Sequence, residues 1–350
     1  MKAIYIKSVV EMLGVNASKL SGKTLLCTGT NGFLGQWVVQ LIKYLNNNIL
    51  DRPCRLLAYD IKLPKESILS EYADSSIKFL SHDLTTKLWP ISGVDIDYVL
   101  HMAGIASPYH YKRRPLETID VAIEGVRSTL EIARHHGAKF LFTSSSEVYQ
   151  TASVIPTPET YIGAIASNNE RSCYDVSKLM AENLTYVYNK SFGLNSSCIR
   201  IFNSFGPGIA ETDSRILPRI ASTIVGKYPI SVYSKSVLPS RTYCPASNTV
   251  AGIFLALLNA KAGEIYNIGM DAPELNVLEL IQRIERVCEI KVPYTLVEPE
   301  DVYLDEPMRR CPDISKAKEF LGYNPLVTLD EGLRQFFEWS LQNYKGLRAG

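Results

Sequence analysis

Tyr174 and Lys178 are the two residues whose types and spacing point most directly to chemistry. They stand four positions apart near the start of a predicted helix and therefore share one helix face. A free tyrosine, with a pKa of ~10, is a poor base at neutral pH, but an adjacent ammonium group favours its phenolate. Tyr174 could then accept the proton of a substrate hydroxyl while hydride leaves the same carbon. The same spacing also arises by chance, as a pair of residues on a helix surface.

A serine-rich segment, TSSSEVY at 143–149, ends the predicted strand 139–145 that precedes this helix. A hydroxyl there, such as that of Ser145, could hydrogen-bond the reacting oxygen together with Tyr174. Glu147 adds a carboxylate that could serve as a general acid or base. Taken alone, the segment is equally well interpreted as an ordinary strand-to-loop transition. The neighbouring motifs are what favour a catalytic role.

The segment TGTNGFLG at 28–35 places three glycines between a predicted strand (23–29) and a predicted helix (33–46). Glycines at this spacing permit a tight turn, close approach of the backbone to a pyrophosphate, and close helix–strand packing. The start of the helix adds unpaired N–H groups and a positive dipole. A glycine-rich turn alone is weak evidence, but the flanking strand and helix support a dinucleotide site. The turn residues expected at the cofactor are Gly29, Asn31, Gly32, Phe33, Leu34 and Gly35.

Asp60 ends the second predicted strand, 55–60, where it could accept hydrogen bonds from the adenosine ribose hydroxyls. A 2′-phosphate would be repelled there, so Asp60 favours NAD over NADP. The alternative is a solvated carboxylate at a strand end. Asp83 and Leu84, at the end of the third predicted strand (78–83), could border the adenine, although Asp83 could equally cap a turn.

The composition argues against several other classes of protein. The 37 basic residues nearly balance the 36 acidic ones, whereas a nucleic-acid-binding protein would normally show a basic excess. No apolar run approaches the ~20 residues of a membrane-spanning helix. Charged residues interrupt the N-terminal segment, which favours a short amphipathic helix over a signal peptide. The seven cysteines are scattered without a CxxC pair, so we expect no disulfide framework, no metal centre and a cytoplasmic location.

Strands and helices alternate through the first two hundred residues, a pattern typical of a doubly wound, Rossmann-type α/β fold with a parallel sheet. Besides the segments above, the sequence predicts strands at 97–104, 197–203 and 264–268 and helices at 115–136, 174–190 and 249–259. The regular alternation of strands and helices ends after residue 206. We therefore expect a dinucleotide-binding domain from residues 1–205 plus 241–269 and a smaller α/β substrate domain from residues 206–240 plus 270–350. The substrate is expected between them, beside the carboxyl ends of the strands.

Together, TGTNGFLG, DL at 83–84, HMAG at 101–104, SSSEVY, YDVSK and RIFNSFGPG resemble the extended short-chain dehydrogenase/reductase family. Its members are NAD-dependent nucleotide-sugar epimerases, dehydratases and decarboxylases, and the resemblance covers residues 22–335. Within the family, the sequence most resembles UDP-glucuronate decarboxylases. The segments that carry this resemblance are HDL at 82–84, HMAGIASP at 101–108, PETYIGAI…RSCYDVSK at 158–178 and MRRCPDISKAKEFLGYNP at 308–325.

The resemblance implies roles for individual residues. Ser145, Ser146 and Glu147 fall on the family's Thr-Ser-Glu, and Tyr174 and Lys178 fall on its catalytic pair, whose lysine also holds the nicotinamide ribose. The NAD-binding set extends to Asp60, Asp83, Leu84, Met102, Ala103 and Gly104. The implied substrate-binding residues are Ser146, Asn203, Arg215, Arg241 and one of Arg309 and Arg310. Asn203 is implied near the diphosphate and Arg241 near the sugar. Of the two adjacent arginines implied at the diphosphate, we choose Arg310 as the candidate.

Three positions depart from the family pattern. Ala122 stands where the family usually has Asn, Gln150 replaces the Gly of the usual VYG, and PASN at 245–248 replaces a segment usually reading YVxD. The last two bear on the identity of the sugar more than on the cofactor.

The resemblance implies an enzyme that uses NAD on a nucleotide sugar, and specifically decarboxylation of UDP-glucuronate through a 4-keto sugar. A 4-epimerase or a 4,6-dehydratase would share the first step. Many family dehydratases carry Asp at the position of Ser146, whereas Glu147 keeps dehydration open. A non-catalytic NAD-binding sensor and a simple alcohol dehydrogenase are further alternatives. A homodimer through helices 115–136 and 174–190 is implied, with no nucleic-acid or membrane partner.

Overall fold

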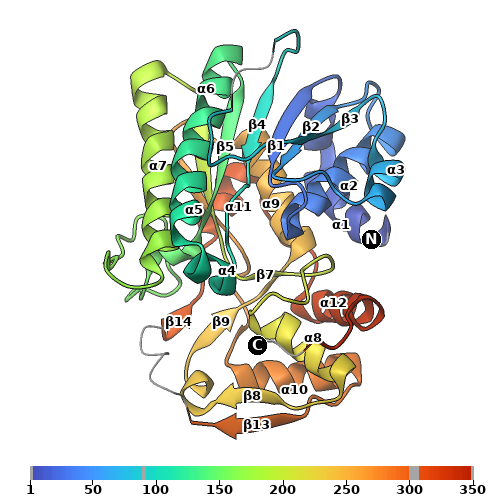
Figure 1. Ribbon diagram of the computed structural model, residues 1–350, viewed down its shortest axis with the longest axis vertical. Coiled ribbons are helices and arrows are strands. Elements are labelled where there is room, and N and C mark those ends of the chain that lie inside the picture. Colours follow the sequence, from blue (N-terminus) through green and yellow to red (C-terminus); the bar gives the residue numbers. More distant parts are fainter. Residues whose placement is uncertain (1–2, 89–91, 299–306, 348–350) are drawn as a thin grey trace.

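The computed structural model describes residues 3–88, 92–298 and 307–347. A parallel seven-stranded sheet forms its upper part, in the order β11-β6-β5-β4-β1-β2-β3 (Figure 1). Its strands are β1 (Thr24–Thr28), β2 (Arg55–Asp60), β3 (Ile77–Ser81), β4 (Tyr98–His101), β5 (Lys139–Ser145), β6 (Ser196–Ile201) and β11 (Ile265–Ile268). The central strands are buried along almost their whole length, as expected when helices cover both faces of a parallel sheet. The predicted doubly wound α/β fold is confirmed.

Helices cover both faces of the sheet. One face carries α2 (Phe33–Asn48), α9 (Ala246–Asn259), α11 (Ser315–Leu321) and the N-terminal α1 (Ala3–Leu13), which share one apolar core. The predicted N-terminal amphipathic helix is therefore present, and Tyr5, Ile6, Val9 and Leu13 are its buried residues. The other face carries α6 (Val126–His136) and α7 (Ser172–Phe192), with α5 (Pro115–Asp120) against α7. The short α3 (Glu66–Tyr72) follows β2.

The helix predicted at 115–136 is interrupted. Between α5 and α6, residues Val121–Gly125 form a wider π-helical turn. Ala122, where the family usually has Asn, lies in this turn and is buried. The chain continues as helix on both sides of the turn, so the hydrophobic pattern that predicted one helix is preserved.

The lower part of the molecule has its own apolar core. Helices α8 (Ile216–Gly226), α10 (Val277–Cys288) and α12 (Leu329–Asn343) pack beside strands β8 (Ile230–Tyr233) and β13 (Tyr294–Val297). Asn276 and Thr328 form capping boxes that satisfy the first N–H groups of α10 and α12. The predicted domain limits at 205/206, 240/241 and 269/270 stay a prediction.

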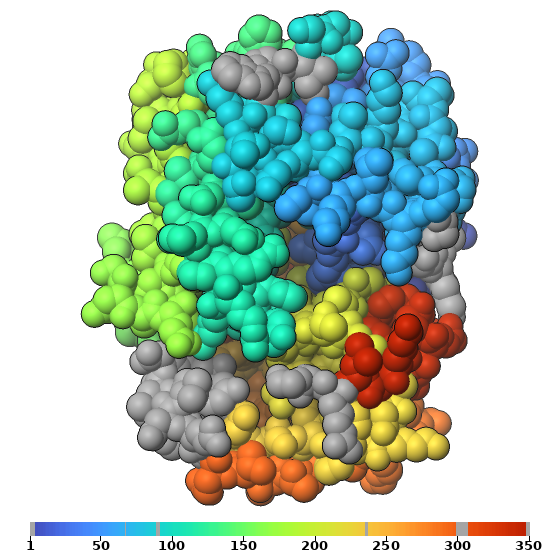
Figure 2. Space-filling model, in the orientation of Figure 1, coloured from blue at the N-terminus to red at the C-terminus, as the bar shows by residue number. Residues whose placement is uncertain are grey.

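Short strands connect the two parts. A three-stranded sheet contains β12 (Glu274–Leu275), β9 (Ser240–Thr242) and β14 (Arg309–Arg310), and a two-stranded one contains β7 (Ser204–Phe205) and β10 (Cys244–Pro245). In the space-filling view, the blue and green upper part meets the yellow and red lower part along a seam across the molecule (Figure 2). Glu147, just past the end of β5, contacts Arg310 of β14. This end of the sheet therefore faces the three-stranded sheet.

Candidate active site

The glycine turn after β1 leaves no room for side chains. Gly29 has φ +77, and a Cβ there would lie 2.9 Å from the backbone of Ala103. A Cβ on Gly35 would lie 2.1 Å from the carbonyl oxygen of Gly29. The Gly32 N–H donates to that same carbonyl at 3.1 Å. The turn is thus a cradle of bare backbone at the start of α2, which suits a pyrophosphate.

Asp60 closes one side of this cradle. One carboxylate oxygen accepts the Asn31 N–H and the other accepts the Ile61 N–H, each at 2.8 Å. Burial raises the pKa of Asp60, while these backbone hydrogen bonds act in the opposite direction. The Lys62 N–H is a third backbone donor to this carboxylate. A carboxylate has about four acceptor sites, so one remains for a ribose hydroxyl.

The other predicted cofactor residues lie at the ends of β3 and β4. Asp83 accepts the Thr85 N–H at 3.0 Å and so does cap a turn. Leu84 is buried in the apolar core on that face of the sheet. The N–H groups of Met102 and Ala103 both donate to the Thr28 hydroxyl, at 3.1 and 3.2 Å, which ties the end of β4 to that of β1.

Tyr174 and Lys178 share a buried face of α7, each 7% exposed. The Lys178 ammonium donates to the Thr143 carbonyl at 2.9 Å and lies 5.8 Å from the centroid of the Tyr174 ring. A Cβ on Gly104 would lie 3.6 Å from the same ammonium, so the lysine lies between the segment after β4 and the tyrosine. Burial lowers the pKa of Lys178 to about 8, although the charge of Glu182 opposes this.

Burial raises the pKa of Tyr174 to about 12, whereas a hydrogen bond with the Ser145 side chain and the charge of Arg215 act to lower it. The effect of Lys178 on the pKa of Tyr174 is thus indirect, because its ammonium is bound to the Thr143 carbonyl near the end of β5. Tyr111, from α4 (Pro108–Arg113), stacks on Tyr174 with ring centroids 5.2 Å apart and an interplanar angle of 10°. This stacking covers one face of the Tyr174 ring, and nothing in the sequence had singled out Tyr111.

Glu147 lies between two arginines. Arg171, which precedes α7, and Arg310 of β14 each donate to one oxygen of its carboxylate. Burial acts to raise the pKa of Glu147, but the charges of Arg310 and Arg171 outweigh it and hold the pKa below its usual value. The group is therefore a carboxylate at neutral pH.

Arg310 and its neighbour have different environments. Arg309 is exposed and binds Glu274 through both its Nε and its Nη2. Arg310 is 5% exposed, and its second terminal nitrogen, Nη2, is buried without a hydrogen-bond partner among the residues that the structure describes. Such a donor is costly to leave unpaired, so it points to an anionic or polar ligand.

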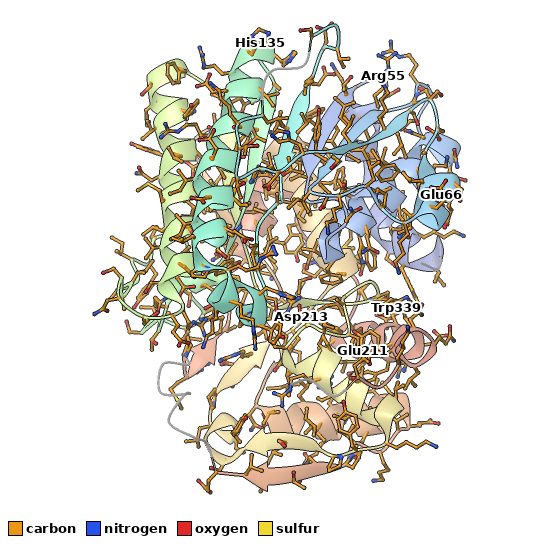
Figure 3. The ribbon with its side chains drawn as sticks, viewed as in Figure 1. Arg55, Glu66, His135, Glu211, Asp213 and Trp339 are labelled. Carbon is orange, nitrogen blue, oxygen red and sulfur yellow. The ribbon has the colours of Figure 1, made fainter. Side chains whose placement is uncertain are left out.

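The remaining predicted substrate residues lie near the junction of the two parts. Asn203, with φ +28, donates to the Thr242 carbonyl at 3.0 Å. Arg215 pairs with Asp213, which Figure 3 labels at the top of the lower part, and also donates to the Ser204 carbonyl. Arg241 donates to the Pro307 carbonyl at 3.0 Å, and its charge acts on Glu147. Ser146 is buried directly after β5.

Comparison with known proteins decides the family. Residues 25–269 match the model of the NAD dependent epimerase/dehydratase family. The chain belongs to this family.

Its relatives include UDP-glucuronic acid decarboxylases of Arabidopsis thaliana. Decarboxylase 1 is 32% identical over 88% of this chain and 68% of its own length, and decarboxylase 6 is 32% identical over 89% and 87%. Among solved structures, UDP-glucuronic acid 4-epimerase from Bacillus cereus in complex with NAD has a TM-score of 0.76 and 24% identity, covering 92% of this chain and 99% of that one. The dTDP-glucose 4,6-dehydratase of Streptomyces venezuelae has a TM-score of 0.77 and 21% identity, covering 91% and 97%.

NAD is the cofactor of this family, and the residues present fit it. The bare backbone at Gly29 and Gly35 suits the pyrophosphate, and Asp60 suits the adenosine ribose. The Lys178 ammonium would be a donor for the other ribose. Bound NAD supplies a hydride acceptor and, later, a hydride donor. Among the described residues no helix is long and apolar enough to cross a membrane, and no cluster of three or more metal-binding side chains is found.

The fold thus brings Ser145, Glu147, Tyr174, Lys178 and Arg310 into one buried group. The sequence interpretation had assigned no role to Arg171 or Asp175, although both lie in the segment RSCYDVSK that carried the resemblance. The sequence did show that a charged residue stands three positions before Tyr174 and another one position after it, and this could have identified both.

Proposed function

We propose that this protein is a lyase that decarboxylates UDP-glucuronate through a 4-keto sugar. The observation that carries this proposal is the buried Arg310 with one unpaired donor, held beside the Tyr174 end of the site by Glu147. Its guanidinium can bind the sugar's carboxylate, a role that replaces the diphosphate contact that the resemblance implied for this position. An enzyme for neutral hexoses does not need such a donor. The decarboxylase relatives support the same substrate.

The chain's own residues have separable tasks in this reaction. Tyr174 accepts the proton of the C4 hydroxyl and later returns it, with Ser145 hydrogen-bonded to the same oxygen. Lys178 orients the nicotinamide ribose of NAD. Arg310 holds the carboxylate next to C5. Once C4 is a ketone, the electrons of the breaking C5–carboxylate bond pass into it to form an enolate, and carbon dioxide leaves without needing an acid. C5 then takes up a proton from water, which restores the ketone at C4 for reduction.

The state of Glu147 argues against dehydration. A 4,6-dehydratase must protonate the leaving hydroxyl at C6, and a serine hydroxyl at Ser146 is a poor acid. Glu147 was the remaining candidate, but two arginines lower its pKa and keep it ionised. The grouping of half-buried Ser145 with the buried Tyr174 and Lys178 also argues against a non-catalytic NAD-binding sensor.

The test is a reaction with UDP-glucuronate carrying ¹³C at C6, alongside UDP-glucose and dTDP-glucose, followed by mass spectrometry. We expect release of labelled carbon dioxide and a UDP-pentose, with both hexose nucleotides unchanged. Loss of water from a hexose nucleotide while UDP-glucuronate stays intact would establish a dehydratase instead. Conversion of UDP-glucuronate to an isomer of equal mass, resolved by NMR, would establish an epimerase.

We also propose that the protein is a homodimer through α5 and α7. Helix α7 exposes the apolar side chains Val176, Leu179, Met180 and Val187, and α5 exposes Leu116 at 74%. Such an apolar stripe on neighbouring helices suits a four-helix bundle with a second copy. Light scattering at micromolar concentration should give twice the chain mass, and Met180→Lys should shift it toward the mass of one chain. A wild-type monomer contradicts the proposal.

We propose a cytoplasmic location on the basis of seven cysteines that are all unpaired thiols. Imaging of a fluorescent fusion in the source cell checks it, and accumulation in a secretory compartment contradicts it.

A further inference from the structure

Gln150 has a backbone conformation that normally requires glycine. Its φ is +50 and its ψ −130, directly after the 3₁₀ turn Ser146–Tyr149. Glycine adopts this conformation without steric cost, whereas the Cβ of Gln150 makes it strained. Strain of this kind persists only where the surrounding structure enforces it, and it concentrates at functional sites.

The Gln150 side chain contacts a second carboxylate of the site. Its amide nitrogen donates to Asp175 Oδ2 and, at 3.3 Å, to the Glu147 carbonyl. Asp175 follows Tyr174 directly and is 1% exposed. Its other oxygen, Oδ1, is buried with no hydrogen-bond partner in the described part of the chain.

Arg171 links Asp175 to Glu147. It donates to Glu147 Oε2, and its Nε lies 3.9 Å from Asp175 Oδ2. Two buried carboxylates therefore compete for one guanidinium, while Arg310 binds only Glu147 among the described residues.

The environments of the two carboxylates shift their pKa values in opposite directions. Burial raises the pKa of Asp175 to about 6, and the charge of Glu147 adds to this, whereas Arg171, the Gln150 hydrogen bond and Arg310 oppose it. Tyr111 of α4 also faces Asp175. Glu147 is held ionised, so Asp175 is the member of this group that changes charge near neutral pH.

We propose that Asp175, held in place by Gln150, is a positioning residue that tunes the affinity of the site for an acidic sugar by setting the charge of the Arg171–Glu147–Arg310 group. This rests on the proposed function, since it assumes that the sugar carries a carboxylate. With Asp175 protonated, the four residues carry a net charge of +1 and Arg171 no longer shares its charge with Asp175. With Asp175 ionised, the net charge is zero and Arg171 is shared, so a carboxylated sugar is bound more weakly.

The test is calorimetric binding of UDP-glucuronate and UDP-glucose to the NAD-bound protein between pH 5.5 and 8. UDP-glucuronate stays ionised throughout this range. Its Kd should rise about tenfold as pH rises through about 6, an effect expected for one added charge near an anionic ligand. The Kd of UDP-glucose should lack this transition.

Two variants and a control complete the design. Asp175→Asn cannot ionise and should give a Kd for UDP-glucuronate that is independent of pH. Gln150→Gly relieves the strain and removes the hydrogen bond that favours the carboxylate, so the transition should move to higher pH. Asp330→Asn removes a carboxylate from a half-buried pair with Arg283 in the lower part of the molecule and should keep the wild-type transition.

The outcomes separate this proposal from the proposed function. A wild-type transition that survives in Asp175→Asn, or an unmoved transition in Gln150→Gly, overturns the role of Asp175. If UDP-glucuronate binds no better than UDP-glucose at any pH, the acidic substrate itself is wrong and the proposed function fails. A KM that follows the same pH dependence while kcat does not confirms that Asp175 acts on binding.

Discussion

The cofactor half and the sugar half of this site are built in different ways. The cofactor half consists mainly of backbone at the ends of adjacent parallel strands, with Asp60 bonded to neighbouring N–H groups. The sugar half consists of charged side chains from distant segments, where Glu147, Arg171 and Arg310 meet. Backbone cradles tolerate little change in shape, whereas a group of charges can be retuned by single substitutions. The predictions below therefore test the shape of the cradle and the charges of the group separately.

The largest loss of activity is expected for a substitution of Tyr174. Tyr174→Phe removes only the proton acceptor, so turnover should fall about 10²- to 10⁴-fold while folding and NAD binding persist. Steady-state kinetics, circular dichroism and NAD titration check this. Near-normal turnover in a folded, NAD-bound variant would rule out the mechanism.

Gly35→Ala tests the rigidity of the cofactor half. Its Cβ would lie 2.1 Å from the Gly29 carbonyl oxygen, so backbone must move, at a cost of about 1–3 kcal/mol or more. NAD affinity should fall roughly 10²-fold. Gly32→Ala is the matched control, because its Cβ would meet the same oxygen at 3.1 Å and should cost less. Equal losses in thermal stability and NAD affinity for the two variants contradict the cradle.

Arg310→Gln tests the sugar half. It removes one of the two charges on Glu147 and the buried donor proposed for the substrate carboxylate. A charge-assisted hydrogen bond contributes about 1.5–3 kcal/mol, so kcat/KM for UDP-glucuronate should fall roughly 10- to 100-fold. Arg309→Gln is the control, because Arg309 is exposed and paired with Glu274. NAD affinity should be unchanged in both variants, and a loss of NAD binding in Arg310→Gln would show that the halves are not separable.

The smallest effect is expected at Asp60, whose carboxylate can be partly replaced by water at the rim of the cradle. Asp60→Ala should weaken NAD about tenfold, within the ~1–3 kcal/mol range for a lost buried hydrogen-bond partner. It should also narrow the preference for NAD over NADP. Calorimetry with both cofactors measures this. A wild-type protein that binds the two equally well would show that the acid is not at the ribose.

Much of the molecule was predictable from local patterns. Short apolar runs separated by helical periodicity predicted all seven strands of the sheet, with β3 and β4 shorter than expected. The pattern did not predict the π-helical turn around Ala122, because the segments on both sides of it are themselves helical. The glycine turn and Asp60 were predictable because each acts through its own backbone and its immediate neighbours.

The sequence by itself determined the fold class, the cofactor turn and the Tyr174–Lys178 pair, since these depend on spacing within one or two adjacent elements. Only the tertiary structure decided that Arg310, rather than Arg309, turns inward to Glu147, and that Arg171 and Asp175 complete the group. Alternate residues of a short strand point to opposite sides, and which side faces the site depends on how β14 pairs with β9. Contacts between residues 147, 171 and 310 arise from the packing of separate elements, which no local pattern encodes.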